Sequence, residues 1–135
     1  MGVCDSDLCP FCNTTKDSIQ HMFWQCNHVQ LFWQALINIV GLNERCTHAI
    51  NMQISESLAL FGIDKDMEID STFYFIILLA KQSIYHCKLN NIMPVLHVFL
   101  QKVKKRYMIE EYIAKSSLKY NDFMTKWIQY KPIFY

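Results

Sequence analysis

The sequence predicts an all-α fold, a small helical domain built from one chain of 135 residues. Apolar side chains recur at intervals of three and four residues through most of the chain, which is the spacing of one helix face. Only three Gly and three Pro are present, too few for the many turns of a β sandwich. Hydrophobic residues make up 52% of the chain, enough to bury a core, and this excludes a disordered chain.

Two helices are expected in the first third of the chain. In the first, Asp17 is placed to act as the N-cap, with Gln20 three residues later as in a capping box. The apolar face of this helix would consist of Ile19, Met22, Phe23 and Cys26. The second helix begins near His28 and ends at Gly41, a residue type that favours helix ends. Its buried stripe would consist of Val29, Phe32, Trp33, Leu36 and Val40.

The middle of the chain is less regular. Residues 59–64, ALFGID, are expected to form a short strand or an irregular crossing. Residues 64–70, DKDMEID, read as an acidic, solvent-facing connection.

Three more helices are expected after Ser71. The first is apolar nearly all round, which favours a central helix, and its main buried face would consist of Phe73, Ile76, Ile77, Ala80, Ile84 and Cys87. Pro94 suits the first turn of the next helix. The buried stripe there would consist of Leu96, Phe99, Leu100, Val103, Tyr107 and Ala114. A last helix would carry Phe123, Trp127 and Ile128.

One cluster of residues near the N-terminus carries recognisable chemistry. Cys9, Cys12, His21 and Cys26 form the pattern C-x2-C-x8-H-x4-C. Thiolates and an imidazole are the ligands that tetrahedral Zn²⁺ prefers, and a C-x2-C pair in a tight turn can hold one ion. Four protein ligands leave no open position, so the sequence predicts a structural zinc knuckle rather than a catalytic site.

The spacing of the last two ligands leaves alternatives open. His21 and Cys26 are five residues apart, about 140° round an ideal helix. They would converge if Cys26 lies in a frayed or tightened last turn, and Asn27 is compatible with a helix end there. His28 and Cys4 are rival ligands. The four residues could also be ordinary core residues, because free Cys is commonly buried.

These patterns favour one domain spanning residues 1–135. Residues 1–45 would hold the zinc knuckle and a helix, residues 46–70 an irregular connection, and residues 71–131 the helical part.

Charge is divided unevenly along the chain. Residues 1–80 contain three basic and nine acidic side chains, whereas residues 81–135 contain ten basic and three acidic ones. Such a basic half suits phosphate groups, although a solvated helix face would look the same. The candidate phosphate contacts are Lys102, Lys104, Lys105 and Arg106, of which the first, third and fourth share a helix face. Phe11 and Trp24 near the knuckle are candidates to stack on an unpaired base, with core packing favoured for Trp24.

Several function classes find no support in the sequence. No glycine-rich phosphate loop, nucleophile signature or paired-aspartate motif is present, so no enzymatic activity is expected. The longest apolar run, Phe73 to Ala80, is eight residues, far short of the ~20 that span a bilayer. The start of the chain is acidic and lacks a secretory signal. We therefore expect an intracellular protein, nuclear or cytoplasmic, that does not enter a membrane.

The knuckle and the residues after it resemble a known family. The C-x2-C pair, the segment HMFWQC and the later Phe-Trp pair resemble the zinc-binding C-terminal segment of reverse transcriptases from LINE-type (non-LTR) retrotransposons. The residues that carry the resemblance are His21, Phe23, Cys26, Phe32 and Trp33, and FYFIILLAKQSIYHCKL with Pro94, Phe99 and Tyr107 extends it towards Trp127.

The resemblance implies a non-catalytic accessory module that binds RNA or another single-stranded nucleic acid. The polymerase and endonuclease portions of that family are absent from these residues, so their activities are not expected. The alternative is a structural or protein-interaction domain whose zinc only stabilises the fold, including the product of a decayed element fragment.

Overall fold

The computed structural model describes residues 7–41, 55–61 and 71–135. Within these ranges the regular elements are all helical, and the only β-type pairing is an isolated bridge between Leu8 and Lys16, so the all-α prediction is confirmed. The elements in chain order are the π-helical turn η1 (His21–Gln25), α1 (Asn27–Gly41), α2 (Glu56–Phe61), α3 (Ser71–Leu89), α4 (Leu96–Ser116), α5 (Tyr120–Trp127) and the 3₁₀ turn η3 (Lys131–Ile133).

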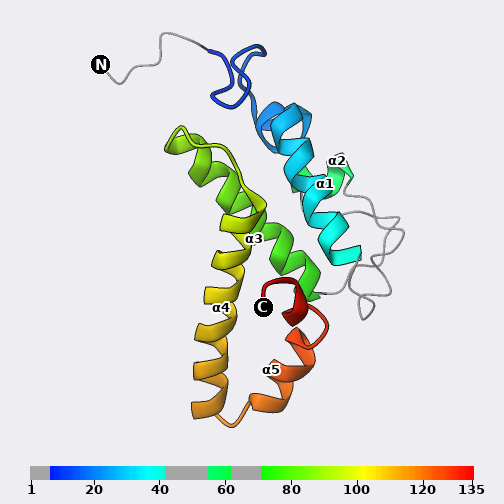
Figure 1. Cartoon of the computed structure of the whole chain (residues 1–135), viewed down its shortest axis with the longest axis vertical. Coiled ribbons are helices and arrows are strands. Elements are labelled where there is room, and N and C mark those ends of the chain that lie inside the picture. The colour runs from blue at the N-terminus through cyan, green and yellow to red at the C-terminus, as the bar shows by residue number, and fades with distance from the viewer. Residues whose placement is uncertain (1–6, 42–54, 62–70) are drawn as a thin grey trace.

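The helices form two connected groups, α3 with α4 and α5, and η1 with α1 and α2. Helices α3 and α4 make an antiparallel hairpin, and α5 turns back along α4, so that the C-terminus ends beside the hairpin (Figure 1). Helix α1 packs on α4, while α2 and α3 contact the η1 turn. We use the name knuckle for residues 7–26, which form one end of the molecule (Figure 1). None of the described helices is both long enough and apolar enough to cross a bilayer.

Helix α1 joins the knuckle to the hairpin. Its bounds agree with the predicted helix to one residue at the start, and its predicted stripe is buried throughout: Val29, Phe32, Trp33, Leu36 and Val40. The Phe32 ring meets the Phe99 ring of α4 edge-on, with centroids 5.5 Å apart. This edge-to-face contact fixes α1 against the hairpin, because such pairs add about 1 kcal/mol to simple burial.

The hairpin follows the predicted periodicity closely. All six residues of the expected α3 face are buried, as are five of the six of the α4 stripe, with Leu96 half-buried. Leu78 is 56% exposed, however, so α3 is covered on most sides rather than all round. Helix α4 begins at Leu96 with Val95 as its N-cap, which places Pro94 just before the helix instead of in its first turn.

Helix α5 is held to the hairpin by polar contacts as well as by burial of Phe123 and Trp127. The indole Nε1 of Trp127 donates to Glu110 of α4 at 2.7 Å. The same carboxylate accepts from Lys126 Nζ at 3.1 Å. The hydroxyl of Thr72 on α3 donates to the Lys126 carbonyl at 3.0 Å. Ile128, by contrast, follows the helix and is 52% exposed.

The middle of the chain differs from the prediction. Residues 59–61 of the ALFGID segment are not a strand or an irregular crossing but the end of helix α2, which buries Leu58 and Ala59. The ammonium of Lys81 on α3 donates to the Leu60 carbonyl at 2.7 Å, so it satisfies one of the carbonyls that a helix end leaves open. Residues 62–64 and the acidic segment 64–70 lie outside the described residues.

The start of the first helical segment is also different. Asp17 is not its N-cap, because the Ser18 hydroxyl accepts the His21 N–H at 3.0 Å instead. The Asp17 carboxylate pairs with Lys88 Nζ of α3 at 2.6 Å, which ties the knuckle to the end of the hairpin. Ile19 is 70% exposed rather than part of a buried face.

Candidate metal centre

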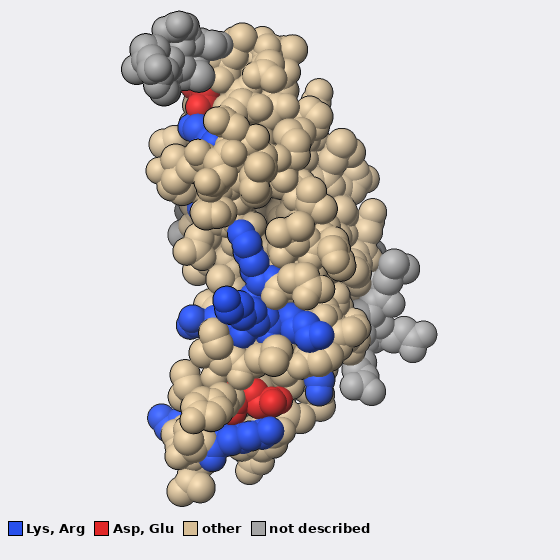
Figure 2. Space-filling model, turned by 60° about the vertical axis from the view of Figure 1, so that its left-hand side comes forward, with Lys and Arg blue, Asp and Glu red and all other residues tan. Residues whose placement is uncertain are grey.

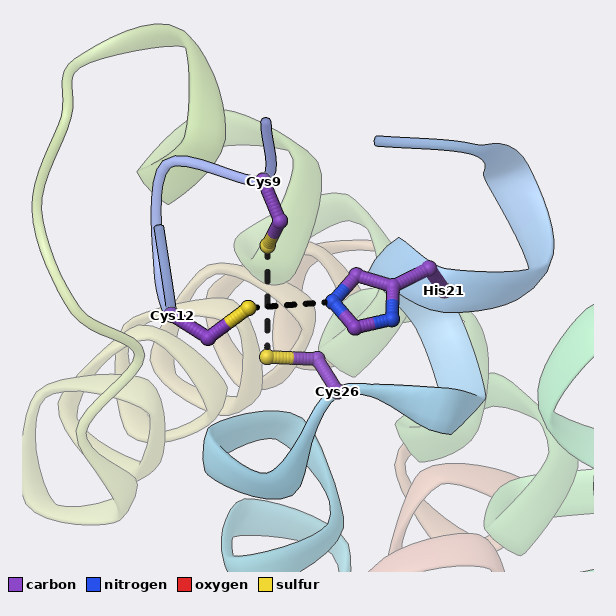
Figure 3. A group of neighbouring side chains, drawn as sticks. All are labelled: Cys9, Cys12, His21 and Cys26. Atoms are coloured by element: carbon purple, nitrogen blue, oxygen red, sulfur yellow. Dashed lines mark hydrogen bonds between the residues drawn. The ribbon is translucent and has the colours of Figure 1, made fainter. Parts of the chain in front are cut away.

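The four predicted ligands converge on one point (Figure 3). The Sγ atoms of Cys9, Cys12 and Cys26 and one ring nitrogen of His21 all lie within 4.8 Å of one another. The Sγ atoms of Cys9 and Cys26 are 3.9 Å apart, and Cys12 Sγ is 3.3 Å from His21 Nε2. Cys9, His21 and Cys26 are buried and Cys12 is half-buried, so this end of the molecule is organised round the group.

A tight loop places the first two cysteines. The Cys9 N–H donates to the Thr15 carbonyl and the Asn13 N–H donates to the Cys9 carbonyl, both at 2.8 Å. Asn13 has φ 55°, a left-handed conformation that Asn tolerates better than most residues. The loop therefore reverses direction within a few residues, and both thiols point to its inner side (Figure 3).

The π-helical turn η1 places the other two ligands. The Cys26 N–H donates to the His21 carbonyl at 2.9 Å, five residues back rather than four. This wider turn brings the two side chains to the same side, which an ideal α-helix would leave about 140° apart. The expected convergence at a helix end is present, but the turn is widened and not frayed or tightened.

Cys26 also begins helix α1. Its backbone is extended, with φ −64° and ψ 130°, and its carbonyl accepts the Gln30 N–H at 2.9 Å. The backbone N–H groups of His28 and Val29 donate to its sulfur. These are the contacts that an N-cap side chain makes, so the Cys26 sulfur lies at the positive end of the α1 dipole.

The thiols of Cys12 and Cys26 differ in their electrostatics. Hydrogen bonds from the Thr14 side chain and backbone, with smaller contributions from the Thr15 backbone and His21, lower the pKa of Cys12 to about 5. Burial raises the pKa of Cys26 to about 11, and the backbone N–H donors at the start of α1 only partly offset it. Cys12 is thus a thiolate at neutral pH before any cation binds, whereas binding of a cation would have to displace the proton of Cys26.

Two of the donor separations can be compared with those of a tetrahedral metal ion. Bonds of about 2.3 Å to sulfur and 2.0–2.1 Å to nitrogen imply sulfur–sulfur separations near 3.8 Å and sulfur–nitrogen separations near 3.6 Å. The observed 3.9 Å and 3.3 Å lie close to these values. These four side chains could therefore hold a metal ion, with the donor set that suits Zn²⁺.

Of the two rival ligands, only His28 lies in the described part of the chain. His28 is not among the four converging residues, and Cys4 lies outside the described part of the chain. Sequence reasoning missed Thr14 and Ser18, which hydrogen-bond the Cys12 sulfur and the His21 backbone. A hydroxyl residue two positions after a loop cysteine, or three before a helical histidine, is the signal that would have found them.

The candidate phosphate contacts lie on α4, and some of them already contact other side chains of the protein. Lys102, Lys105 and Arg106 are exposed, and basic residues gather across the middle of the face in Figure 2. Lys102 Nζ is 3.5 Å from the Ser83 hydroxyl of α3, and Arg106 pairs with Glu110 at 3.4 Å. Lys104 is half-buried, with its ammonium 4.4 Å from the centre of the Tyr135 ring. Lys104 therefore belongs to a different side of α4.

The two aromatic candidates are not presented to a ligand. Phe11 is only 5% exposed and belongs to the hydrophobic core, so its ring is not accessible to a base in this structure. Trp24 is half-buried and packs against the same core, as favoured for it.

Comparison with known proteins gives no further guide to this group of residues. No protein-family model, no curated protein and no solved structure matches the chain.

Proposed function

We propose that the chain is a non-catalytic nucleic-acid-binding module whose N-terminal end is held together by one Zn²⁺. The observation that carries the metal assignment is that the donor atoms of Cys9, Cys12, His21 and Cys26 lie within 4.8 Å of one another, and that three thiols and an imidazole are a donor set that suits Zn²⁺. A fourth protein ligand closes the site to an activated water, so the proposed role of zinc is structural.

Two features support the nucleic-acid part of the proposal. Lys102, Lys105 and Arg106 are exposed along one flank of α4, in the half of the chain with ten basic and three acidic side chains. The resemblance of the knuckle to the tail of LINE-type reverse transcriptases points to RNA or single-stranded nucleic acid, bound with little sequence preference. Phosphate contacts of this kind supply most non-specific affinity.

The zinc assignment is tested by elemental analysis of the purified protein. We expect one equivalent of zinc per chain, and its loss in the double variant Cys9→Ser with Cys12→Ser. A matched control is Cys87→Ser, because Cys87 is buried on α3 outside the ligand group. Zinc-free wild-type protein, or unchanged zinc content in the double variant, would refute the assignment.

The nucleic-acid assignment is tested by titrating affinity for a labelled single-stranded RNA against salt concentration. Three neutralised phosphates predict a slope of about −2 in log affinity against log salt, from roughly 0.7 per contact. The variant Lys102→Gln with Lys105→Gln should reduce the slope to about −0.7. Arg106 is left in place because its pairing with Glu110 stabilises the attachment of α5.

The control variant is Lys16→Gln with Lys119→Gln, which removes the same charge from two exposed lysines elsewhere. We expect its slope to match that of the wild type. Equal slopes for all three proteins would remove the α4 lysines from the mechanism.

A structural or protein-interaction domain is the second candidate. Internal partners for several cations favour it: Arg106 and Lys126 bind Glu110, and Lys115 binds Glu111. If the wild type fails to bind RNA even at low salt while retaining zinc, this second function is the one to pursue.

A further inference from the structure

The solvent-facing side of α4 combines charge with exposed apolar surface. Helix α4 buries one stripe against α1, α3 and α5, and the opposite side carries what we call the outer face of α4. Its exposed residues are Val98, Gln101, Lys105, Met108, Ile109, Tyr112 and Ser116. Figure 2 shows basic side chains gathering on the molecule next to broad uncharged surface.

Tyr112 is the most exposed tyrosine that the structure describes, at 77%. Among the described residues its ring takes part in none of the aromatic or cation–π contacts, whereas the rings of Tyr107, Tyr120, Tyr130 and Tyr135 all do. An aromatic side chain held on a regular helix with its ring exposed loses little conformational entropy on binding, since only two side-chain torsions need fixing. Such a ring is suited to stack on a planar ligand.

The position of Tyr112 relative to Lys105 indicates what kind of ligand the outer face could bind. Lys105 precedes it by seven residues, which is about 20° short of two full turns, so both side chains lie on nearly the same line of the helix. Their separation along the axis is about 10 Å. Met108 and Ile109 lie between them and are 54% and 46% exposed.

The outer face carries no competing negative charge. The two carboxylates of α4, Glu110 and Glu111, are half-buried. Glu110 accepts hydrogen bonds from Trp127 and Lys126, and Glu111 accepts one from the Tyr107 hydroxyl at 3.1 Å. Because both have partners within the protein, an anionic strand that follows this helix face would meet Lys105 and then the Tyr112 ring without passing a carboxylate of α4.

The geometry points to Tyr112 as the stacking residue of the module: a single strand lies along the outer face of α4, with phosphates on Lys105 and on Lys102 at the edge of this face, and an unpaired base on the Tyr112 ring. This inference rests on the proposed nucleic-acid function. It assigns the stacking role to the exposed Tyr112 ring in place of the buried Phe11 ring. Stacking tolerates every base, so it adds affinity without strong sequence preference.

The test compares three variants in binding to a short single-stranded RNA. We expect Tyr112→Ala to weaken binding about tenfold, a typical effect of losing one stacked base. The slope of log affinity against log salt should stay at the wild-type value, because stacking releases no counterions. Tyr112→Phe keeps the ring and should bind within about twofold of the wild type. Tyr85→Ala, at a 48% exposed tyrosine of α3, is the matched control and should bind normally.

Photocrosslinking of the wild type gives a second readout that needs no substitution. Cleavage after Arg106 and Lys115 releases the peptide YMIEEYIAK, and the crosslinked nucleotide should map to Tyr112 and not to Tyr107, which is 1% exposed. Normal affinity of Tyr112→Ala together with a weakened Lys102→Gln, Lys105→Gln variant would overturn the stacking role and leave the proposed function intact. Absence of binding by the wild type would refute both. A change in self-association of Tyr112→Ala without a change in RNA affinity would reassign this face to protein contacts.

Discussion

Cys12 and Cys26 belong to the same group of ligands, yet their surroundings favour opposite protonation states. Cys12 lies in a polar loop whose hydroxyl and N–H donors lower its pKa to about 5. Cys26 lies in the core, where burial raises its pKa to about 11. At pH 7 the metal-free protein therefore carries a thiolate at Cys12 and a thiol at Cys26.

This difference predicts selective alkylation of the metal-free protein. With a chelator present at pH 7, iodoacetamide should modify Cys12 before Cys26, because the thiolate is the reactive form and the Cys12 side chain is half-buried rather than fully buried. The rate at Cys12 should decline only as the pH falls towards about 5. Peptide mapping by mass spectrometry measures the order of modification.

The Cys12→Ser variant serves as the control and should lose the fast phase. Zinc should suppress the reaction in the wild type, since coordination occupies the sulfur lone pairs. Faster modification of Cys26 than of Cys12 would contradict the assignment.

At the scale of single elements, the start of α1 depends on the Cys26 sulfur independently of any metal. The His28 and Val29 N–H groups donate to that sulfur. Serine is a good N-cap and alanine is a poor one. In metal-free protein, Cys26→Ser should therefore be more stable than Cys26→Ala, by about 1 kcal/mol in the free energy of unfolding.

Urea denaturation followed by far-UV circular dichroism, with chelator present throughout, measures this difference. Both variants should fail to retain zinc, so metal content is the internal control. If Cys26→Ala is as stable as Cys26→Ser, the sulfur does not cap the helix.

The attachment of α5 to α4 depends on the Glu110 carboxylate, which accepts hydrogen bonds from Trp127 and Lys126. Glu110→Ala would leave the buried Trp127 indole N–H without its acceptor, and an unsatisfied buried donor costs about 1–3 kcal/mol. Trp127→Phe removes the donor itself. In a double-mutant cycle we expect the two substitutions to be non-additive, with Glu110→Ala less destabilising in the Trp127→Phe background.

Thermal or urea unfolding of the four proteins in the cycle supplies the coupling energy. Glu56→Ala, which removes an exposed acid from α2, is a suitable control for the loss of charge. Strict additivity would show that the 2.7 Å contact does not contribute to stability.

The elements that the sequence predicts well are those decided by burial alone. The stripe of α1, with Phe32 and Leu36, follows from the 3.6-residue period, and the structure buries both. The four residues that could hold a metal ion were predicted for a similar reason, because residue type and spacing suffice to indicate such a group. The π turn was not predictable, since one wide hydrogen bond between His21 and Cys26 leaves no periodic signal. Asp17 was misassigned because its tertiary partner Lys88 is far away in the chain.

At the scale of the whole molecule, the proposed zinc should stabilise one end more than the rest. The knuckle is joined to the hairpin by the Asp17–Lys88 ion pair and by the Lys81 ammonium, which lies 5.2 Å from the centre of the Phe23 ring. The hydrophobic core includes Phe11 and Met22 of the knuckle, and helix α1 packs into it through Phe32 and its neighbours. Loss of the metal would remove coordination bonds from the knuckle only, because Cys9, Cys12, His21 and Cys26 all lie there.

Chelation should therefore increase hydrogen exchange in residues 9–26 and leave α3 and α4 protected. Exchange measured by mass spectrometry, with and without chelator, tests this expectation. Binding and local folding are coupled at such sites because the unfolded chain has no preformed group of ligands. Uniform loss of protection through α4 would show instead that the whole domain unfolds with the metal.

The π turn has a consequence for how this chain tolerates changes in length. Loss of one residue between His21 and Cys26 would let an ordinary α turn run into α1 and would rotate that helix by about 100° relative to the metal ligands. One added residue would rotate it by a similar angle in the other sense. Either the ligands or the α1 stripe could then face inwards, but not both. Across evolution, the number of residues in this interval should be held more strictly than their identity, as at the exposed Gln25.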